Sequence, residues 1–146
     1  MILVAGISTR ILVQSLSKNY KIISLDCFGD LDTLKLACYW RRIKRNGLEI
    51  DNDHFLKIFT VTVKEFSPVA WIYGGGFEGK IDVIETADKL LPRFGINNKS
   101  LDQLFEPKKF FAELKKSKIH YPPTSIIKKN KVPLPGWLWK DLHSSG

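Results

Sequence analysis

Cysteines are few, long apolar runs are absent and acidic residues are in the minority in this sequence of 146 residues. Cys27 and Cys38 cannot build a disulfide framework, so we expect a reducing compartment, the cytoplasm. No apolar run approaches the roughly 20 residues of a membrane-spanning helix, so no membrane partner is expected. The opening apolar run, residues 1–5, is shorter than a signal-peptide core. The three histidines lie far apart without a second metal ligand at a suitable spacing, so we predict no metal site.

Hydrophobic residues make up 44% of the sequence and charged residues 26%, which is the balance of a folded globular domain rather than a disordered chain. The net charge of +8 is unevenly distributed. Residues 106–146 contain nine lysines and three acidic residues, a net charge of +6, whereas residues 1–105 carry only +2. The basic quarter therefore either meets an anionic partner or is a separate piece without its acidic complement.

Alternating strands and helices are predicted along most of the chain. Residues 1–5, 21–25 and 69–73 are apolar runs typical of strands buried on both faces of a parallel sheet. The pattern thus predicts an α/β fold, a short parallel sheet with helices on both faces. Helices are expected after Ser8 or Thr9 and over 53–66, 81–91, 99–105 and 107–118, the last burying Phe110, Phe111 and Leu114. Less regular segments are interpreted as a basic turn or short helix (40–45), a very short strand or connector (94–96) and a strand (136–140).

Gly6 closes the first predicted strand, and Ser8 and Thr9 follow ahead of a helix. Rossmann-type folds bind phosphate at this position. The second and third glycines of the dinucleotide fingerprint are missing, so NAD or FAD is not expected. The same residues also fit a tight turn into a capped helix, and both interpretations stay open.

Asp26 ends the second predicted strand, and Asp30 and Asp32 follow it closely. Because ligands collect at the carboxyl ends of strands in open α/β sheets, these carboxylates could hold a ribose or a cation. They could equally be helix caps and turn formers.

A glycine-rich segment, residues 74–79, directly follows the third predicted strand. Gly75 and Gly76 either let backbone amides approach a ligand or permit a turn. Phe77 and Glu78 lie among these glycines and are expected to be well displayed.

Several motifs, taken in order, resemble one group of ATP-grasp proteins, relatives of biotin carboxylase and of the carbamoyl-phosphate synthase large subunit. The resemblance covers nearly the whole chain. Its most specific pieces are Phe28-Gly-Asp-Leu-Asp-Thr33 and Gly75-Gly-Phe-Glu78. The later pieces are Pro107 with Phe110-Phe111, Tyr121-Pro-Pro-Thr124, Gly136-Trp-Leu-Trp-Lys140 and Ser144-Ser-Gly146.

This resemblance implies a Rossmann-like pre-ATP-grasp domain over residues 1–97, a helical linker over 98–118 and the truncated beginning of an ATP-grasp domain over 119–146. The first domain would bind a small-molecule carboxylate substrate through residues at the strand ends. By the same match, Lys140 is similar to the family's ATP-phosphate lysine. The residues similar to the glycine-rich loop over the phosphates are Ser144, Ser145 and Gly146. Lys108 would replace a basic nucleotide contact that the family has before Pro107.

The implied activity is that of a ligase: ATP and Mg²⁺ activate a carboxylate as an acyl phosphate, which a nucleophile then takes up. Because the sequence ends at Gly146 within the phosphate loop, we expect the fragment itself to be neither catalytic nor a tight ATP binder. The alternative is a module that binds nucleic acid or another polyanion through the basic quarter. That quarter fits a solvated helix face as well, because Lys108, Lys109, Lys115 and Lys116 would lie opposite the stripe of Phe110, Phe111 and Leu114.

Assembly is the last expectation. In a strand, Trp137 and Trp139 would share one face, and the sheet that should cover it is missing. We therefore expect a homo-oligomer, a missing C-terminal partner, or a tail held against the first domain.

Overall fold

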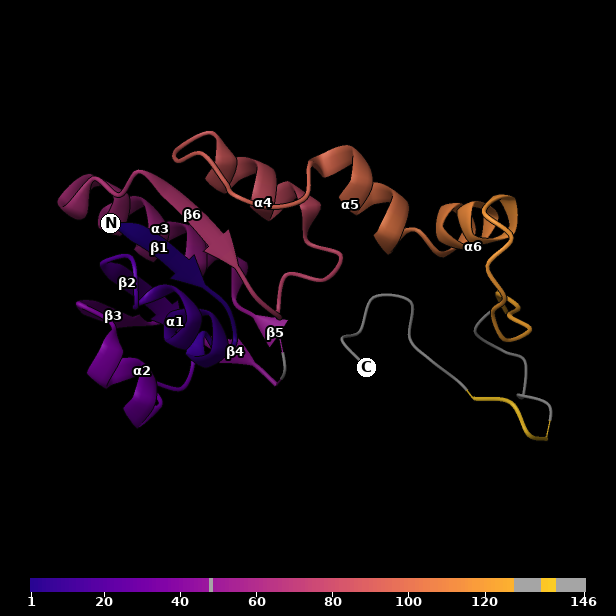
Figure 1. Ribbon diagram of the computed structural model, residues 1–146, viewed down its shortest axis with the longest axis horizontal. Helices are drawn as coiled ribbons and strands as arrows, with labels where there is room; N and C mark the ends of the chain where they lie inside the picture. The colour runs from indigo at the N-terminus through magenta and orange to yellow at the C-terminus, as the bar shows by residue number, and fades with distance from the viewer. Residues whose placement is uncertain (48, 128–134, 139–146) are drawn as a thin grey trace.

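A four-stranded sheet forms the centre of the computed structural model, which describes residues 1–47, 49–127 and 135–138 (Figure 1). Its pairings are all parallel, which confirms the predicted α/β fold with a short parallel sheet. In spatial order the strands are β3 (Tyr39–Arg42), β2 (Ile22–Asp26), β1 (Ile2–Ala5) and β6 (Ala70–Tyr73).

Helices cover both faces of this sheet, as expected. On one face, α1 (Arg10–Leu16) and α2 (Leu31–Leu36) contact each other. On the other face, α3 (Asn52–Phe66) contacts α4 (Ile81–Asp88). Two separate buried clusters result, because alternate strand residues point to opposite sides of the sheet.

The larger cluster, between the sheet and α3 and α4, is built on aromatic rings. The Trp71 ring lies 5.1 Å from that of Phe59, and the Phe55 ring lies 4.9 Å from that of Phe77. All four side chains are almost fully buried. The helix α3, which carries Phe55 and Phe59, is capped by Asp51, whose side chain accepts a hydrogen bond from His54 N. The predicted helix over 53–66 therefore forms despite its β-branched centre.

The order of the strands creates a topological switch point. The chain runs outward from β1 to β2 and β3, and α3 then returns it to β6 on the other side of β1. In open α/β sheets, ligands bind at the carboxyl ends of the strands flanking such a reversal. Here the loops at that position follow β1 and β6.

Three further elements surround this frame. A short antiparallel hairpin, β4 (Arg45–Asn46) and β5 (Glu49–Ile50), follows β3. Beyond α4 come α5 (Asn98–Phe105) and α6 (Pro107–Lys116), and Figure 1 shows α6 away from the sheet. Leu101 of α5 is buried in the larger core cluster, whereas α6 buries no residue: Phe110, Phe111 and Leu114, predicted as its buried face, are only half-buried.

A polar network joins β6 and α4 to the start of α5. The Arg93 guanidinium pairs with Asp88 at 3.0 Å and also bonds Asn98, the first residue of α5. The indole Nε1 of Trp71 donates to the same Asp88 carboxylate at 3.0 Å. Because the Arg93 side chain is only 7% exposed, its charge has to be balanced internally, and Asp88 does so.

Two sequence interpretations are corrected. Residues 40–45, predicted as a turn or short helix, contribute to strands β3 and β4. β3 is half-buried at the edge of the sheet and contains two arginines, so it lacks the continuous apolar run of the two inner strands. The strand predicted over 136–140 is not found in its described part, because Trp137 and Leu138 belong to no strand. Its last two residues lie outside the described residues. Residues 94–96 are a connector, with a single bridge between Arg93 and Trp71.

Candidate functional site

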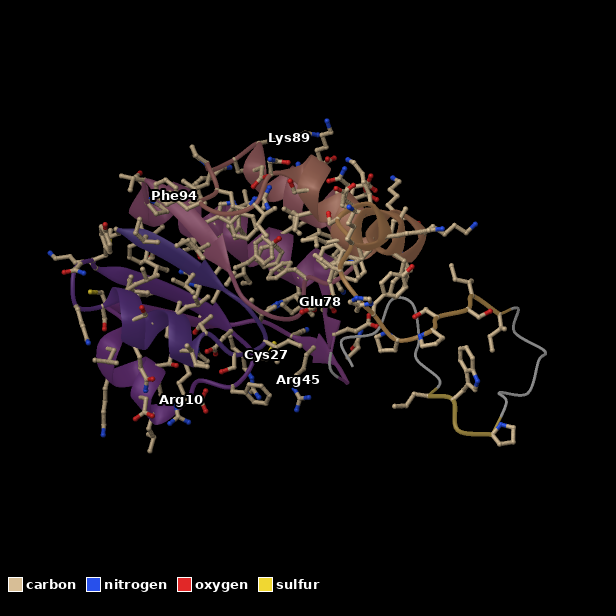
Figure 2. All side chains as sticks on the ribbon, turned by 45° about the vertical axis from the view of Figure 1, so that its right-hand side comes forward. Arg10, Cys27, Arg45, Glu78, Lys89 and Phe94 are labelled. Atoms are coloured by element: carbon tan, nitrogen blue, oxygen red, sulfur yellow. The ribbon has the colours of Figure 1, made fainter. Side chains whose placement is uncertain are left out.

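Four loops meet at the carboxyl ends of the parallel strands: residues 6–9 after β1, 27–30 after β2, 43–45 after β3 and 74–80 after β6. We call this region the carboxyl edge. Backbone hydrogen bonds tie three of the loops together, from Ile7 N to Gly75 O at 2.9 Å and from Cys27 N to Ile7 O at 3.0 Å. Figure 2 shows Cys27, Arg45 and Glu78 at this end of the sheet, with Lys89 and Phe94 away from it.

Asp26 is the centre of the carboxyl edge and is fully buried. Its Oδ2 accepts from Thr9 Oγ1 at 2.9 Å and, over a longer 3.4 Å, from Thr9 N. Its Oδ1 accepts from Gly29 N and Trp40 Nε1, each at 2.8 Å, and from Phe28 N at 3.2 Å. These are the contacts of a turn former, whereas a ligand-binding role for Asp26 remains a prediction.

The residues after β1 hold the loop after β2 rather than cap their own helix. Thr9 occupies the N-cap position of α1, but its hydroxyl bonds Ser24 Oγ at 2.7 Å and Asp26. The Ser8 hydroxyl donates to Asp30 at 3.2 Å. Gly6 is buried in a tight turn, and its N donates to Leu25 O. The segment forms the predicted tight turn, but bonds across the edge replace the side-chain cap, and phosphate binding at this position remains a prediction.

Asp32 points toward α1, where it pairs with the exposed Arg10 at 2.9 Å. The structure thus brings all three predicted carboxylates to one edge, each with a protein partner of its own. Among the described residues, no group of three or more His, Cys, Asp or Glu side chains is arranged to hold a metal ion.

The glycine-rich loop after β6 is fixed at several points. Gly76 N donates to Glu78 Oε2 at 2.7 Å, and Gly74 N donates to Ala5 O at 2.8 Å. Gly75, between them, is exposed. Glu78 is half-buried. The expectation that Phe77 is displayed is wrong: the ring is 1% exposed, because it fills the aromatic core beneath the loop.

Sequence reasoning missed Lys80, which closes this loop. Its ammonium donates to Ile50 O and to Asn52 Oδ1, each at 2.8 Å, with Glu49 at 3.7 Å. It therefore anchors the glycine-rich loop to the junction of β5 and α3. A lysine after a glycine carries no sequence signal for such a bond, because both acceptors are about thirty residues away along the chain.

The basic run 40–45 divides into different environments. Trp40 turns inward to Asp26, whereas Arg42 and Arg45 lie at the carboxyl edge. Arg42 Nε donates to Cys27 O at 3.3 Å, and the Arg45 guanidinium lies 5.0 Å from the centre of the exposed Phe28 ring. Burial, followed by the charge of Asp26, raises the pKa of the Cys27 thiol, and the two arginines act in the opposite direction.

Of the predicted nucleotide-binding residues, the structure describes only Lys108. Lys140, Ser144, Ser145 and Gly146 lie outside the described residues. Lys108 is exposed on α6, away from the sheet in Figure 1. Their assignment to ATP remains a prediction from the resemblance.

The class of protein that this architecture defines is an α/β domain with a doubly wound parallel sheet. Its fold is that of a biotin carboxylase-like domain: the biotin carboxylase domain of a single-chain bacterial carboxylase superposes with a TM-score of 0.65 over 89% of this chain, at 11% sequence identity. The chain spans 32% of that domain's length. No family model matches the sequence, and no curated protein matches it. None of the helices in the described part of the chain is both long and apolar enough to span a bilayer.

Proposed function

We propose that this chain is the N-terminal part of an ATP-grasp ligase or carboligase-like enzyme, and that its carboxyl edge forms the substrate side of the active site. The observation that carries the proposal is the agreement of two features. The fold is like that of a biotin carboxylase domain, and the two most specific motifs lie at the carboxyl edge, Gly75–Glu78 after β6 at the switch point and Phe28–Thr33 after β2.

Backbone donors at the switch point suit a carboxylate substrate. Ser8 and Gly75 are exposed on the neighbouring loops after β1 and β6, and in the described part of the chain neither backbone N–H has an acceptor. Two such N–H groups held on bonded loops can hydrogen-bond a carboxylate without a side chain. Glu78, later in the same loop, accepts a hydrogen bond from Gly76 N and would thereby position the adjacent backbone N–H of Gly75.

The rest of the site would come from the C-terminal side. In the complete enzyme, ATP with Mg²⁺ would convert the carboxylate into an acyl phosphate, which a nucleophile would then attack. Lys108, Lys140 and the segment Ser144–Gly146 would contact the nucleotide. On this proposal residues 1–97 are the pre-ATP-grasp domain, residues 98–118 the linker and residues 119–146 the start of the ATP-grasp domain.

Two measurements test this proposal. Isothermal titration of the 146-residue chain with Mg-ATP should show no tight binding, and sub-micromolar affinity would overturn the view that its nucleotide site is incomplete. A polypeptide extended by the coding sequence downstream of Gly146 should release ADP only when a carboxylate, bicarbonate included, is added. Carboxylate-independent ATP hydrolysis, or none with any member of a carboxylate panel, would contradict the ligase assignment.

The polyanion-binding alternative gains no support from α6. Lys109 and Lys116 pair with Asp102 and Glu113, as on an ordinary solvated helix face. This alternative remains a prediction of oligonucleotide binding that weakens steeply with salt.

Self-association, or a partner that supplies the C-terminal part, completes the proposal. Trp137 is 45% exposed and Leu138 is 87% exposed, and α6 buries no residue. Light scattering should show an oligomer for the full chain and a smaller species for a chain ending at Lys118. Monomers in both cases would contradict self-association.

A further inference from the structure

Arg42 and Arg45 lie at the β2–β3 side of the carboxyl edge without a counter-ion. Ion pairs in the described part of the chain involve six other basic residues, and no described carboxylate lies within 4.0 Å of either guanidinium. Charged side chains with no partner are common on protein surfaces, where water solvates them and their positions vary. These two arginines differ in being held in place.

Each guanidinium has a fixed contact with the same dipeptide. Arg42 Nε donates to Cys27 O at 3.3 Å, and the Arg45 guanidinium stacks on the ring of Phe28, the next residue. Arg45 Nη1 also donates to Gly47 O at 2.6 Å. An arginine whose conformation is fixed in advance loses less entropy when it binds an anion, and its remaining N–H groups form a fork suited to carboxylate or phosphate oxygens.

The neighbouring carboxylates make their contacts with other groups. Asp26 already accepts from five donors, Asp30 accepts from Ser8, and Asp32 pairs with Arg10. The β2–β3 side of the carboxyl edge therefore presents two guanidinium groups that pair with no described carboxylate.

We propose that Arg42 and Arg45 form a subsite for an anionic group of the substrate, a phosphate or a second carboxylate. This inference rests on the proposed function, in that the substrate lies over the carboxyl edge. It adds the substrate class: a compound that carries a separate anionic group in addition to the carboxylate held near Ser8 and Gly75. Phe28 acts as a positioning residue, because its ring fixes the Arg45 guanidinium.

The test is an NMR titration of the full 146-residue chain at low ionic strength, with pyrophosphate in one arm and succinate in the other. The Nε–H signals of Arg42 and Arg45 should shift and saturate, and the arm with the higher affinity identifies the anion as phosphate or carboxylate. Arg42→Gln and Arg45→Gln should each weaken binding about tenfold, the loss of one charge-assisted hydrogen bond. Phe28→Leu should weaken it less, because the charge remains.

Lys57→Gln is the matched control, since Lys57 is an exposed cation on α3. It should leave the affinity unchanged, and circular dichroism should show every variant folded. Non-saturating shifts, or an equal loss in the Lys57 variant, would overturn the subsite, because binding would then be diffuse. The titration needs no ATP, so a ligase assay that fails on the extended polypeptide would refute the proposed function without changing the anion affinity measured here.

Discussion

Replacing Asp26 by alanine tests whether this carboxylate organises the carboxyl edge. The substitution removes the acceptor of three hydrogen bonds of 2.9 Å or less, from Thr9 Oγ1, Gly29 N and Trp40 Nε1. Asp26 and Thr9 are fully buried, so the abandoned Thr9 hydroxyl cannot turn to water. It can only strengthen its existing bond with Ser24.

The expected cost follows from these contacts. A hydrogen bond to a charged group contributes about 1.5–3 kcal/mol net, but such contributions are not additive within one network. Half-buried Trp40 can recover part of its loss by reaching water. We therefore expect Asp26→Ala to lower the free energy of unfolding by about 3–5 kcal/mol. Asp26→Asn keeps one oxygen for Gly29 and Trp40 and should cost about 1–2 kcal/mol.

Urea unfolding followed by tryptophan fluorescence measures these differences. Asp32→Ala is the control, because it removes a carboxylate of the same segment whose pair with Arg10 is exposed, and it should cost less than about 1 kcal/mol. An Asp26→Ala protein as stable as the Asp32→Ala protein would refute the reasoning. If the alanine variant does not fold, Asp26→Asn still tests the reasoning, because its free energy of unfolding should lie below that of the wild type by about 1–2 kcal/mol.

Three further predictions concern single side chains. Gly76→Ala should destabilise the protein by about 2–4 kcal/mol in the same urea assay, because φ is +101° and a Cβ would lie 2.6 Å from the Ile7 side chain. Gly47→Ala is the control: φ is +61° and a Cβ would meet nothing within 4 Å, so it should cost about 1 kcal/mol. Equal costs of the two substitutions would contradict this reasoning. Thr33→Val should be neutral or stabilising by up to about 1 kcal/mol, because the buried Thr33 hydroxyl has no hydrogen-bond partner among the residues that the structure describes. A clear loss of stability would reveal such a partner. A thiol reagent should label exposed Cys38 and spare Cys27 at neutral pH. Rapid labelling of both thiols would contradict the burial of Cys27. Burial raises the pKa of the Cys27 thiol, so the neutral thiol contributes its full stability below the ordinary thiol pKa of about 8.5. That contribution is lost as the pH rises through the raised pKa.

Three of the four strands of the sheet, β1, β2 and β6, could be predicted from the sequence because each contains a continuous apolar run. Residues 1–5, 21–25 and 69–73 each contain such a run and each became a strand. Of the two edge strands, β6 keeps an apolar run, whereas β3 was missed because two of its four residues are arginines. Edge strands commonly carry charge, which hides them from pattern analysis.

The candidate site was predictable in position but not in its contacts. Asp26 and the glycine-rich loop were placed at strand ends by sequence, and the parallel sheet brings them together. Which partner each side chain takes depends on register and loop conformation. Phe77 illustrates the difficulty: a lone aromatic residue among glycines suggests display, yet the turn directs it into the core.

Similarity of fold at 11% identity with the biotin carboxylase domain has a physical explanation in the carboxyl edge. Some of the bonds that hold its loops together are backbone bonds, such as Ile7 N to Gly75 O and Cys27 N to Ile7 O, and a backbone bond places little restriction on the side chain of the residue that makes it. Identity is restricted only where the geometry demands it, at the left-handed Gly76 and the buried acceptor Asp26. Exposed residues of the carboxyl edge, such as Arg42 and Arg45, can therefore differ between proteins without changing the sheet that holds them.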